Sequence, residues 1–165
     1  MTARPPELRI LVCGTADRGD DGAALAAISR VLPGLPDALR SRLEIRRCQQ
    51  LDALDVMDVG PGVACVVVDT VVGVAPGSTV QIRLEELARH RGSVTPRSSH
   101  ALAVDDALLI AEVCRGSLPA GYFVGIGGKW FGYGERFSRA VKAGLPDFAV
   151  AIQASIEELI ATLPV

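Results

Sequence analysis

Acidic residues crowd a short, glycine-rich stretch near the start of the chain. Residues 14–22 read Gly-Thr-Ala-Asp-Arg-Gly-Asp-Asp-Gly and so contain three aspartates and three glycines. Glycine permits tight and left-handed turns, while carboxylates can bind a metal ion or accept a proton. The plainer interpretation is a capped turn, because an aspartate can satisfy the first amides of a following helix. A cap accounts for Asp20 but leaves Asp17 and Asp21 available for chemistry.

Two further polar residues stand next to predicted structural elements. Asp69 ends an apolar run, residues 63–69, and is either a turn former or a ligand aimed at the edge of a sheet. His100 follows two serines at the start of a predicted helix, where it could be a ligand, an exposed first-turn residue or a helix cap. The other histidine, His90, lies in a basic stretch and is predicted to be a surface residue.

Asp21, Asp69 and His100 together suit one kind of chemistry better than any of them does alone. Two carboxylates and an imidazole can hold a divalent transition metal and leave coordination positions open. They are too few to form a closed structural metal site. The sequence contains no Gly-x-Ser-x-Gly motif, no His-Glu-x-x-His motif and no evident Cys–His pair. A phosphate-binding loop is excluded as well, because no Gly-Lys-Ser or Gly-Lys-Thr follows the glycines.

These residues can meet only if the elements around them bring their loops together. Strands are predicted over residues 9–13, 43–48, 63–69, 78–84 and 121–126. Helices are predicted over residues 22–32, 51–58, 101–115, 135–143 and 146–162, the third capped by Ser98 or Ser99 and ended by Gly116, and the last two separated by Gly144-Leu145-Pro146. The run 63–69 is apolar on both faces, which is typical of a central parallel strand.

The alternation of strands and helices predicts an α/β fold. We expect a single domain over residues 1–165, built as a three-layer sandwich. Its centre would be a mainly parallel, twisted sheet of about five strands with helices on both faces. In such sheets, ligands bind outside the carboxyl ends of the strands. This rule places the loops that carry Asp21, Asp69 and His100 at one edge of the sheet.

Composition excludes several classes of protein. The chain has 165 residues, 49% of them apolar and 22% charged, which is ordinary for one globular domain. A formal net charge of −2 gives no reason to expect nucleic acid or an anionic membrane as a partner. No segment reaches the roughly 18 apolar residues of a membrane span, and the first residues lack the apolar stretch of a secretion signal. We therefore expect a cytoplasmic protein.

The four cysteines, Cys13, Cys48, Cys65 and Cys114, form no Cys-x-x-Cys motif. In a reducing compartment they are expected to remain thiols rather than to build a disulfide framework. Three of them lie in or beside predicted strands, where cysteine packs as a small apolar residue. A structural role in the core is the expected one.

Several short motifs follow one another in a fixed order along the chain. They are residues 10–14, 18–22, 66–69, 76–78, 98–100, 124–126 and 137–141. In this order they resemble parts of the hydrogenase maturation endopeptidases: an opening strand with its glycine–acid–acid loop, an aspartate-ending central strand and the turn beyond it, a histidine loop, and a last strand and helix. The resemblance covers nearly the whole chain.

The resemblance implies an activity, a site and a fold. Members of that family are cytosolic proteases, aspartic-type by convention, that remove the C-terminal peptide of a nickel–iron hydrogenase large-subunit precursor after nickel insertion. The positions that match the family's metal-binding residues are Asp21, Asp69 and His100. The implied metal is nickel carried by the precursor, or another divalent transition metal in the free protein. The implied partner is that precursor, and the implied fold is a twisted sheet between helices.

The expected mechanism is metal-assisted peptide hydrolysis, in which the metal polarises the scissile carbonyl or activates a water molecule. Asp17 and Asp20 are second-rank candidates for accepting a proton from that water. An alternative from a different class is a non-catalytic, flavodoxin-like module that binds a metal ion or a small ligand. A metal-dependent phosphatase is a third hypothesis, but only Arg18 stands near to bind a phosphate.

Three stretches depart from the family's pattern. The first loop is shorter than in the family, and residues 48–51 and Gly127-Gly128 differ in sequence. These departures concern contacts with the substrate and leave the three metal-binding candidates in place. Trp130, Phe131 and Tyr133 stand among glycines after the last predicted strand. They predict either an exposed loop that contacts a partner or a patch of core.

Overall fold

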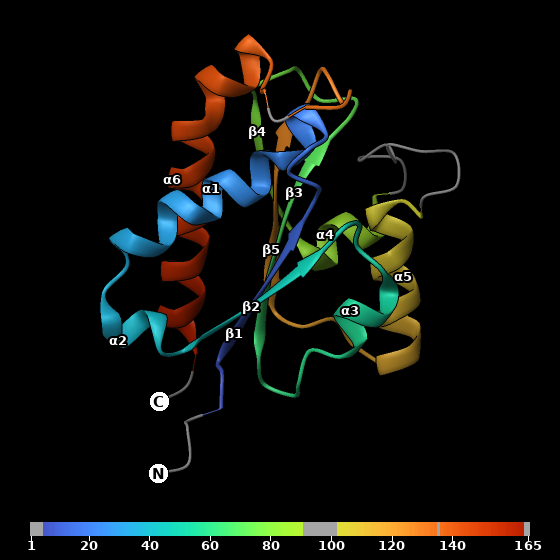
Figure 1. Ribbon diagram of the computed structural model, residues 1–165. Coiled ribbons are helices and arrows are strands. Elements are labelled where there is room, and N and C mark those ends of the chain that lie inside the picture. The colour runs from blue at the N-terminus through green and yellow to red at the C-terminus, as the bar shows by residue number, and fades with distance from the viewer. Residues whose placement is uncertain (1–4, 91–101, 135, 164–165) are drawn as a thin grey trace.

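In the part of the chain that the structure describes, one five-stranded sheet lies between two layers of helices (Figure 1). The computed structural model describes residues 5–90, 102–134 and 136–163. The strands are β1 (Leu8–Cys13), β2 (Leu43–Cys48), β3 (Ala64–Val71), β4 (Thr79–Arg83) and β5 (Gly121–Gly127). Their order is β2-β1-β3-β5-β4; β4 runs antiparallel to β5, and the other neighbouring pairs are parallel. The predicted three-layer α/β sandwich is confirmed.

Helices cover both faces of this sheet (Figure 1). One face carries α1 (Ala23–Val31), α2 (Asp37–Arg40) and α6 (Arg139–Thr162), with the 3-10 turns η1 (Gly19–Gly22) and η2 (Leu32–Gly34) on either side of α1. The other face carries α3 (Ala53–Met57), α4 (Leu84–Arg89) and α5 (Val104–Arg115). The buried residues of α1 recur at helical spacing, so one stripe of that helix packs on the sheet and on α6.

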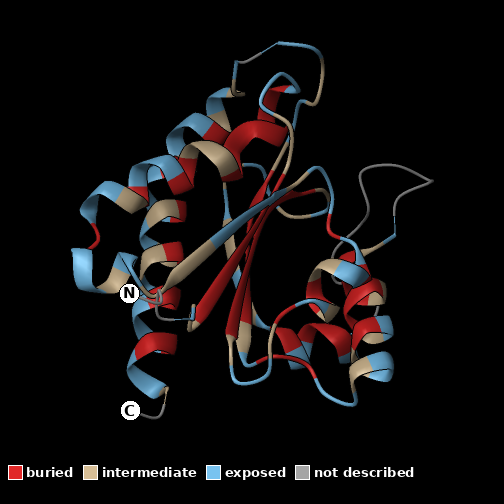
Figure 2. Ribbon diagram, turned by 60° about the horizontal axis from the view of Figure 1, so that its bottom comes forward, coloured by how far each residue is buried: buried red, intermediate tan, exposed pale blue. Residues whose placement is uncertain are grey.

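β3 is the centre of the molecule, as its apolar sequence predicts. All eight of its residues are buried, and the central strands of the sheet are red in Figure 2. The apolar side chains of β3 alternate between two cores. Val66 and Val68 lie in the core under α1 and α6, whereas Val67 and Val71 lie in the core under α4 and α5. β2 lies at an edge of the sheet and is largely exposed, which fits its partial alternation.

The last helix differs from its prediction. The sequence predicts two helices, but α6 is one helix of 24 residues that contains Pro146. Leu145 and Phe148 are fully buried, so burial of the apolar face outweighs the hydrogen bond that the proline removes. Gly144 serves close packing rather than helix ending, because a Cβ there would lie 2.1 Å from the carbonyl oxygen of Gly77. Neither α6 nor any other described helix is long and apolar enough to cross a membrane.

The start of α5 is also later than the sequence predicts. The helix begins at Val104, with Ala103 as its N-cap and no side-chain cap. The two serines expected to cap it, Ser98 and Ser99, lie outside the described residues. Its end is as predicted, because Gly116 adopts the left-handed conformation with φ of +86°.

The strand order reverses its direction at β1. From β1 the chain passes through α1 to β2 on one side, and then through α3 to β3 on the other side of β1. In open α/β sheets, ligands bind at such a switch point, outside the carboxyl ends of the two strands. The carboxyl ends of β1 and β3 are therefore the place where this fold favours a site.

Candidate functional site

The loop after β1 folds back on itself and holds the carboxylate of Asp21. Gly14 has φ of +125°, and a Cβ there would lie 2.0 Å from the carbonyl oxygen of Asp21, so only glycine fits. The amide of Thr15 donates a hydrogen bond of 2.8 Å to Oδ2 of Asp21. Asp21 is only 8% exposed. The first predicted site residue is thus a buried carboxylate that the backbone of its own loop holds in place.

Asp20 does not cap the helix that follows it, although the sequence suggests such a cap. Neither η1 nor α1 has a side-chain cap. The Asp20 carboxylate instead accepts hydrogen bonds from the amides of Lys129 (2.8 Å), Trp130 (2.9 Å) and Ser138 (2.6 Å). Burial alone would raise the pKa of Asp20, but these hydrogen bonds outweigh it and the pKa is lowered. The lowered pKa makes Asp20 a poor proton acceptor, against its second-rank role in hydrolysis.

Asp69 lies inside β3 rather than at its end, because the strand continues to Val71. The prediction that Asp69 ends the strand is therefore wrong, and Asp69 is not a turn former. The residue is 4% exposed, and its Oδ1 accepts a hydrogen bond of 2.7 Å from the amide of Thr70. Burial raises the pKa of the Asp69 carboxyl to about 7, although the Thr70 amide lowers it in part. A carboxylate buried in this way is stabilised by an approaching cation.

Two observations bring the loop of Asp21 and the strand of Asp69 together. The Thr70 hydroxyl donates a hydrogen bond of 2.9 Å to the carbonyl oxygen of Asp20, so the residues next to both candidates are bonded to each other. β1 and β3 are neighbouring strands, and their paired register ends one residue before Asp69. The two predicted aspartates therefore lie on adjoining segments at the β1/β3 switch point.

The third predicted ligand, His100, lies outside the described residues. Leu102 follows it closely in sequence, and the carbonyl oxygen of Leu102 accepts a hydrogen bond of 3.4 Å from Nε2 of Gln50. Gln50 comes just after β2, at the same edge of the sheet as the loop after β1. Within residues 5–90, 102–134 and 136–163, no group of three or more His, Cys, Asp or Glu side chains is placed to hold a metal ion.

Solved structures of known proteins share this architecture, whereas no protein-family profile and no curated sequence matches the chain. The hydrogenase maturating endopeptidase HybD from E. coli aligns over 92% of this chain and 93% of its own, with 19% identity and a TM-score of 0.72. The [NiFe] hydrogenase maturation protease HycI from Thermococcus kodakarensis aligns over 92% of both chains, with 18% identity and a TM-score of 0.64. The endopeptidase HycI from Escherichia coli aligns over 89% of both chains, with 15% identity and a TM-score of 0.61.

The chain has the fold of the hydrogenase maturation endopeptidases. The expectation that the resemblance raised about the fold is therefore confirmed. In this shared fold, Asp21 follows the first strand and Asp69 lies near the carboxyl end of the central one. That is where doubly wound sheets bind their ligands.

Asp17 and His90 lie on the surface of the protein. Asp17 is exposed, and its carbonyl oxygen accepts a hydrogen bond of 2.8 Å from the amide of Gly134. His90 is exposed at the end of α4, where its Nδ1 lies 2.8 Å from the carbonyl oxygen of Glu86. The prediction that His90 is a surface residue is confirmed.

Two aromatic residues after β5, Trp130 and Tyr133, are exposed and pack beside the acidic loop. Trp130 is 43% exposed and Tyr133 is 77% exposed. The Trp130 ring packs on Gly19, where a Cβ would lie 2.4 Å from the ring. The Arg18 guanidinium lies 4.0 Å from the centre of the Tyr133 ring and donates a hydrogen bond of 3.1 Å to its hydroxyl. Of the two predicted alternatives, the exposed loop is therefore correct for Trp130 and Tyr133.

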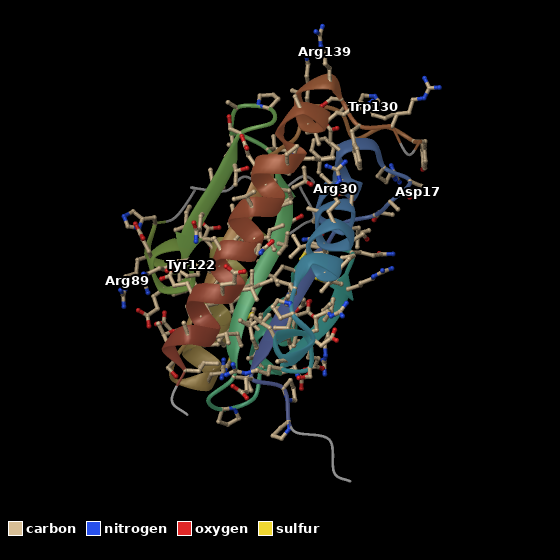
Figure 3. The ribbon with its side chains drawn as sticks, turned by 90° about the vertical axis from the view of Figure 1, so that its left-hand side faces the viewer. Asp17, Arg30, Arg89, Tyr122, Trp130 and Arg139 are labelled. Carbon is tan, nitrogen blue, oxygen red and sulfur yellow. The ribbon has the colours of Figure 1, made fainter. Side chains whose placement is uncertain are left out.

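A cavity of about 650 Å³ opens next to Trp130. Its lining comes from the loop after β5 and the start of α6: Lys129, Trp130, Ser138, Arg139, Ala140 and Ala143. Figure 3 shows Trp130 and Arg139 at the same end of the molecule as Asp17. The sequence gives no sign of this cavity, because its walls are joined through the three hydrogen bonds to Asp20, a residue more than 100 positions away.

Proposed function

We propose that this protein is an endopeptidase that removes the C-terminal peptide of a nickel–iron hydrogenase large-subunit precursor after nickel insertion. In this proposal, Asp21, Asp69 and His100 recognise the nickel that the precursor carries, so the metal is part of the substrate. The observation that supports it most is the pair of buried aspartates at the β1/β3 switch point. The fold shared with HybD and HycI supports the same activity.

Burial gives the two aspartates a physical reason to bind a cation. Asp69, with its pKa raised to about 7, is disfavoured as a bare carboxylate. A nickel ion within reach of Asp21 and Asp69 would stabilise both carboxylates, since an opposite charge lowers their pKa. The imidazole of His100 would add a ligand type that suits nickel. A precursor with nickel would then bind more tightly than one without it, and this difference in affinity is the basis of a checkpoint.

Cleavage requires a polarised carbonyl group and an activated water molecule. Nickel held between the precursor and the aspartates would polarise the scissile carbonyl or lower the pKa of a bound water. One carboxylate of the pair would accept the proton that the water loses. Asp21 and Asp69 are both candidates for this proton acceptor, and the proposal assigns the role to neither of them singly.

The cavity beside Trp130 is the proposed binding place for the part of the precursor next to the bond that is cut. The half-exposed indole offers an apolar face to a side chain of the precursor. Lys129 and Arg139 give the lining a positive charge, which favours acidic groups. The amides of Lys129 and Trp130 both bond to Asp20, so a peptide in this cavity would lie beside the loop that carries Asp21.

The test is an incubation of the purified protein with a purified large-subunit precursor, prepared with and without nickel. We expect a loss of mass confined to the C-terminal tail of the nickel-loaded precursor. Binding without any loss of mass would instead favour the flavodoxin-like binding module. Asp17→Asn is the matched control, because Asp17 is exposed, and it should cut at the normal rate.

A further inference from the structure

Two cysteines stand side by side where β1 and β2 end. Cys13 is the last residue of β1, Cys48 is the last residue of β2, and the register of the two parallel strands pairs them. Their Sγ atoms lie 2.8 Å apart. Both are thiols in the structure. Cys13 lies in an apolar core and Cys48 packs against it, as the sequence predicts. Packing of small apolar residues does not by itself require the two sulfurs to be in contact.

The backbone geometry of this pair suits a disulfide bond. Neighbouring strands lie about 4.8 Å apart, and disulfides join residues whose Cα atoms are about 4.4–6.8 Å apart. With the Sγ atoms of Cys13 and Cys48 at 2.8 Å, small side-chain rotations would bring them to bonding distance, about 2.05 Å. Cys13 is fully buried, whereas Cys48 is only partly buried. A reagent in solution therefore meets Cys48 first.

We propose that Cys13 and Cys48 are a site of reversible disulfide formation, with a small-molecule disulfide such as oxidised glutathione as the oxidant. The Cys48 thiolate attacks one sulfur of glutathione disulfide, which forms a mixed disulfide at Cys48 and releases one glutathione thiolate. The Cys13 thiolate then attacks Sγ of Cys48 and releases the second glutathione. The two protein thiols lose two electrons and two protons, and one glutathione disulfide becomes two glutathione thiols.

The pair is attached directly to the loop that carries Asp21. Cys13 precedes Gly14, and the amide of Gly14 donates a hydrogen bond of 3.0 Å to the carbonyl oxygen of Cys48. Gly14 in turn lies against the carbonyl oxygen of Asp21, with no room for a Cβ. A bond between Cys13 and Cys48 would therefore tie the base of this loop to β2. The inference holds whatever reaction the aspartates perform, because it rests on the two thiols alone.

The experiment uses the full chain with Cys114→Ser, which removes the exposed thiol on α5. The folded protein is treated with oxidised glutathione, then denatured in acid and weighed as intact protein and as peptides. We expect the loss of two hydrogen atoms and a peptide cross-linked between Cys13 and Cys48. Treatment with dithiothreitol should restore the starting mass. Cys65 should stay unmodified, because it is fully buried and burial raises the pKa of its thiol to about 12.

A second variant separates the two steps. With Cys13→Ser added, Cys48 should retain one glutathione, because the thiol that would displace it is gone. If this variant does not fold, as circular dichroism would show, Cys13→Ala takes its place. The proposal is overturned if the parent chain stays unmodified under conditions that oxidise dithiothreitol. It is overturned equally if glutathione remains bound to Cys48 of the parent chain and no cross-linked peptide forms.

Discussion

Three aspartates of the site region, all buried, differ in how their charge is balanced. The Asp20 carboxylate accepts hydrogen bonds from three backbone amides, and its pKa is lowered despite burial. The Asp69 carboxyl accepts one hydrogen bond, from the amide of Thr70, and burial raises its pKa to about 7. Asp21 is held by the amide of Thr15. These environments push the carboxyl pKa values of Asp20 and Asp69 apart, which favours different roles for the two residues. The backbone holds Asp20 as an anion, while Asp21 and Asp69 are the carboxylates that we propose for a substrate cation.

Asp20→Asn tests the structural role of this carboxylate. The substitution keeps the shape of the side chain but removes the charge and turns an amide group toward at least one of the three backbone donors. We expect the free energy of unfolding to fall by about 2 kcal/mol, the scale of a lost charge-assisted hydrogen bond in a buried place. Urea denaturation measures it. Asp17→Asn, at an exposed position, should change it by less than about 0.5 kcal/mol, and equal effects would contradict the assignment.

At the scale of elements, the loop after β1 depends on a glycine that no other residue can replace. Gly14 combines φ of +125° with a backbone oxygen only 2.0 Å from the place that a Cβ would take. The two restrictions act together, because a side chain would strain the dihedral angles and push away the segment that carries Asp21. The geometry of the site therefore depends on the end of β1 as much as on the acidic side chains.

Gly14→Ala should accordingly destabilise the protein by about 2–4 kcal/mol, from backbone strain and overlap together. The free energy of unfolding in urea is again the measurement. Gly34→Ala is the matched control, because a Cβ at that position meets nothing within 4 Å. That control should be stable to within about 0.5 kcal/mol of the parent chain. A Gly14→Ala variant of normal stability would show that the loop has a different path.

A hydrogen bond between β5 and α6 makes the stability of the protein depend on pH. The Tyr122 hydroxyl donates a hydrogen bond of 2.6 Å to Glu158, which raises the pKa of Tyr122 above its ordinary value. The neutral phenol is the favoured form in the folded protein, so this contribution to stability is present below pH 10 and is lost as the pH rises through the raised pKa. Phenolate absorbance should show that Glu158→Gln lowers the pKa of Tyr122. Tyr122→Phe assigns the signal, since the chain has two tyrosines; an unchanged titration would contradict this account.

At the scale of the whole molecule, the sequence predicts the sheet and the position of Asp21 in the loop after β1, because apolar runs are local patterns. It ends β3 too early, at Asp69, because the strand continues to Val71. It does not predict the role of Asp20, whose amide donors are more than 100 residues away. It also does not predict the unbroken α6, because the local effect of Pro146 is outweighed by burial against the sheet. The sequence also does not predict α2, which has only four residues, or α4, which follows β4 directly without a turn between them.

The proposed binding place beside Trp130 depends on the whole fold, since hydrogen bonds join its walls to Asp20 in the loop after β1. Arg139→Glu should raise KM for the precursor about tenfold with little change in kcat, the scale of about 1.4 kcal/mol of binding free energy. Arg30→Glu makes the same change of charge on α1, at an exposed residue that does not line the cavity. Steady-state kinetics on the nickel-loaded precursor compare the two. Equal effects would show that only net charge matters.

The central claim is that nickel carried by the precursor is bound by Asp21, Asp69 and His100, and that this binding is needed for cleavage. Single-turnover cleavage of nickel-loaded precursor tests it most directly, with Asp21→Asn, Asp69→Asn and His100→Ala compared with the parent chain. Circular dichroism first confirms that each variant is folded. We predict that cleavage slows by about two orders of magnitude or more in every variant, as when one electrostatic group of a catalytic site is removed. Cleavage at the parent rate by folded Asp21→Asn and His100→Ala variants would contradict the claim.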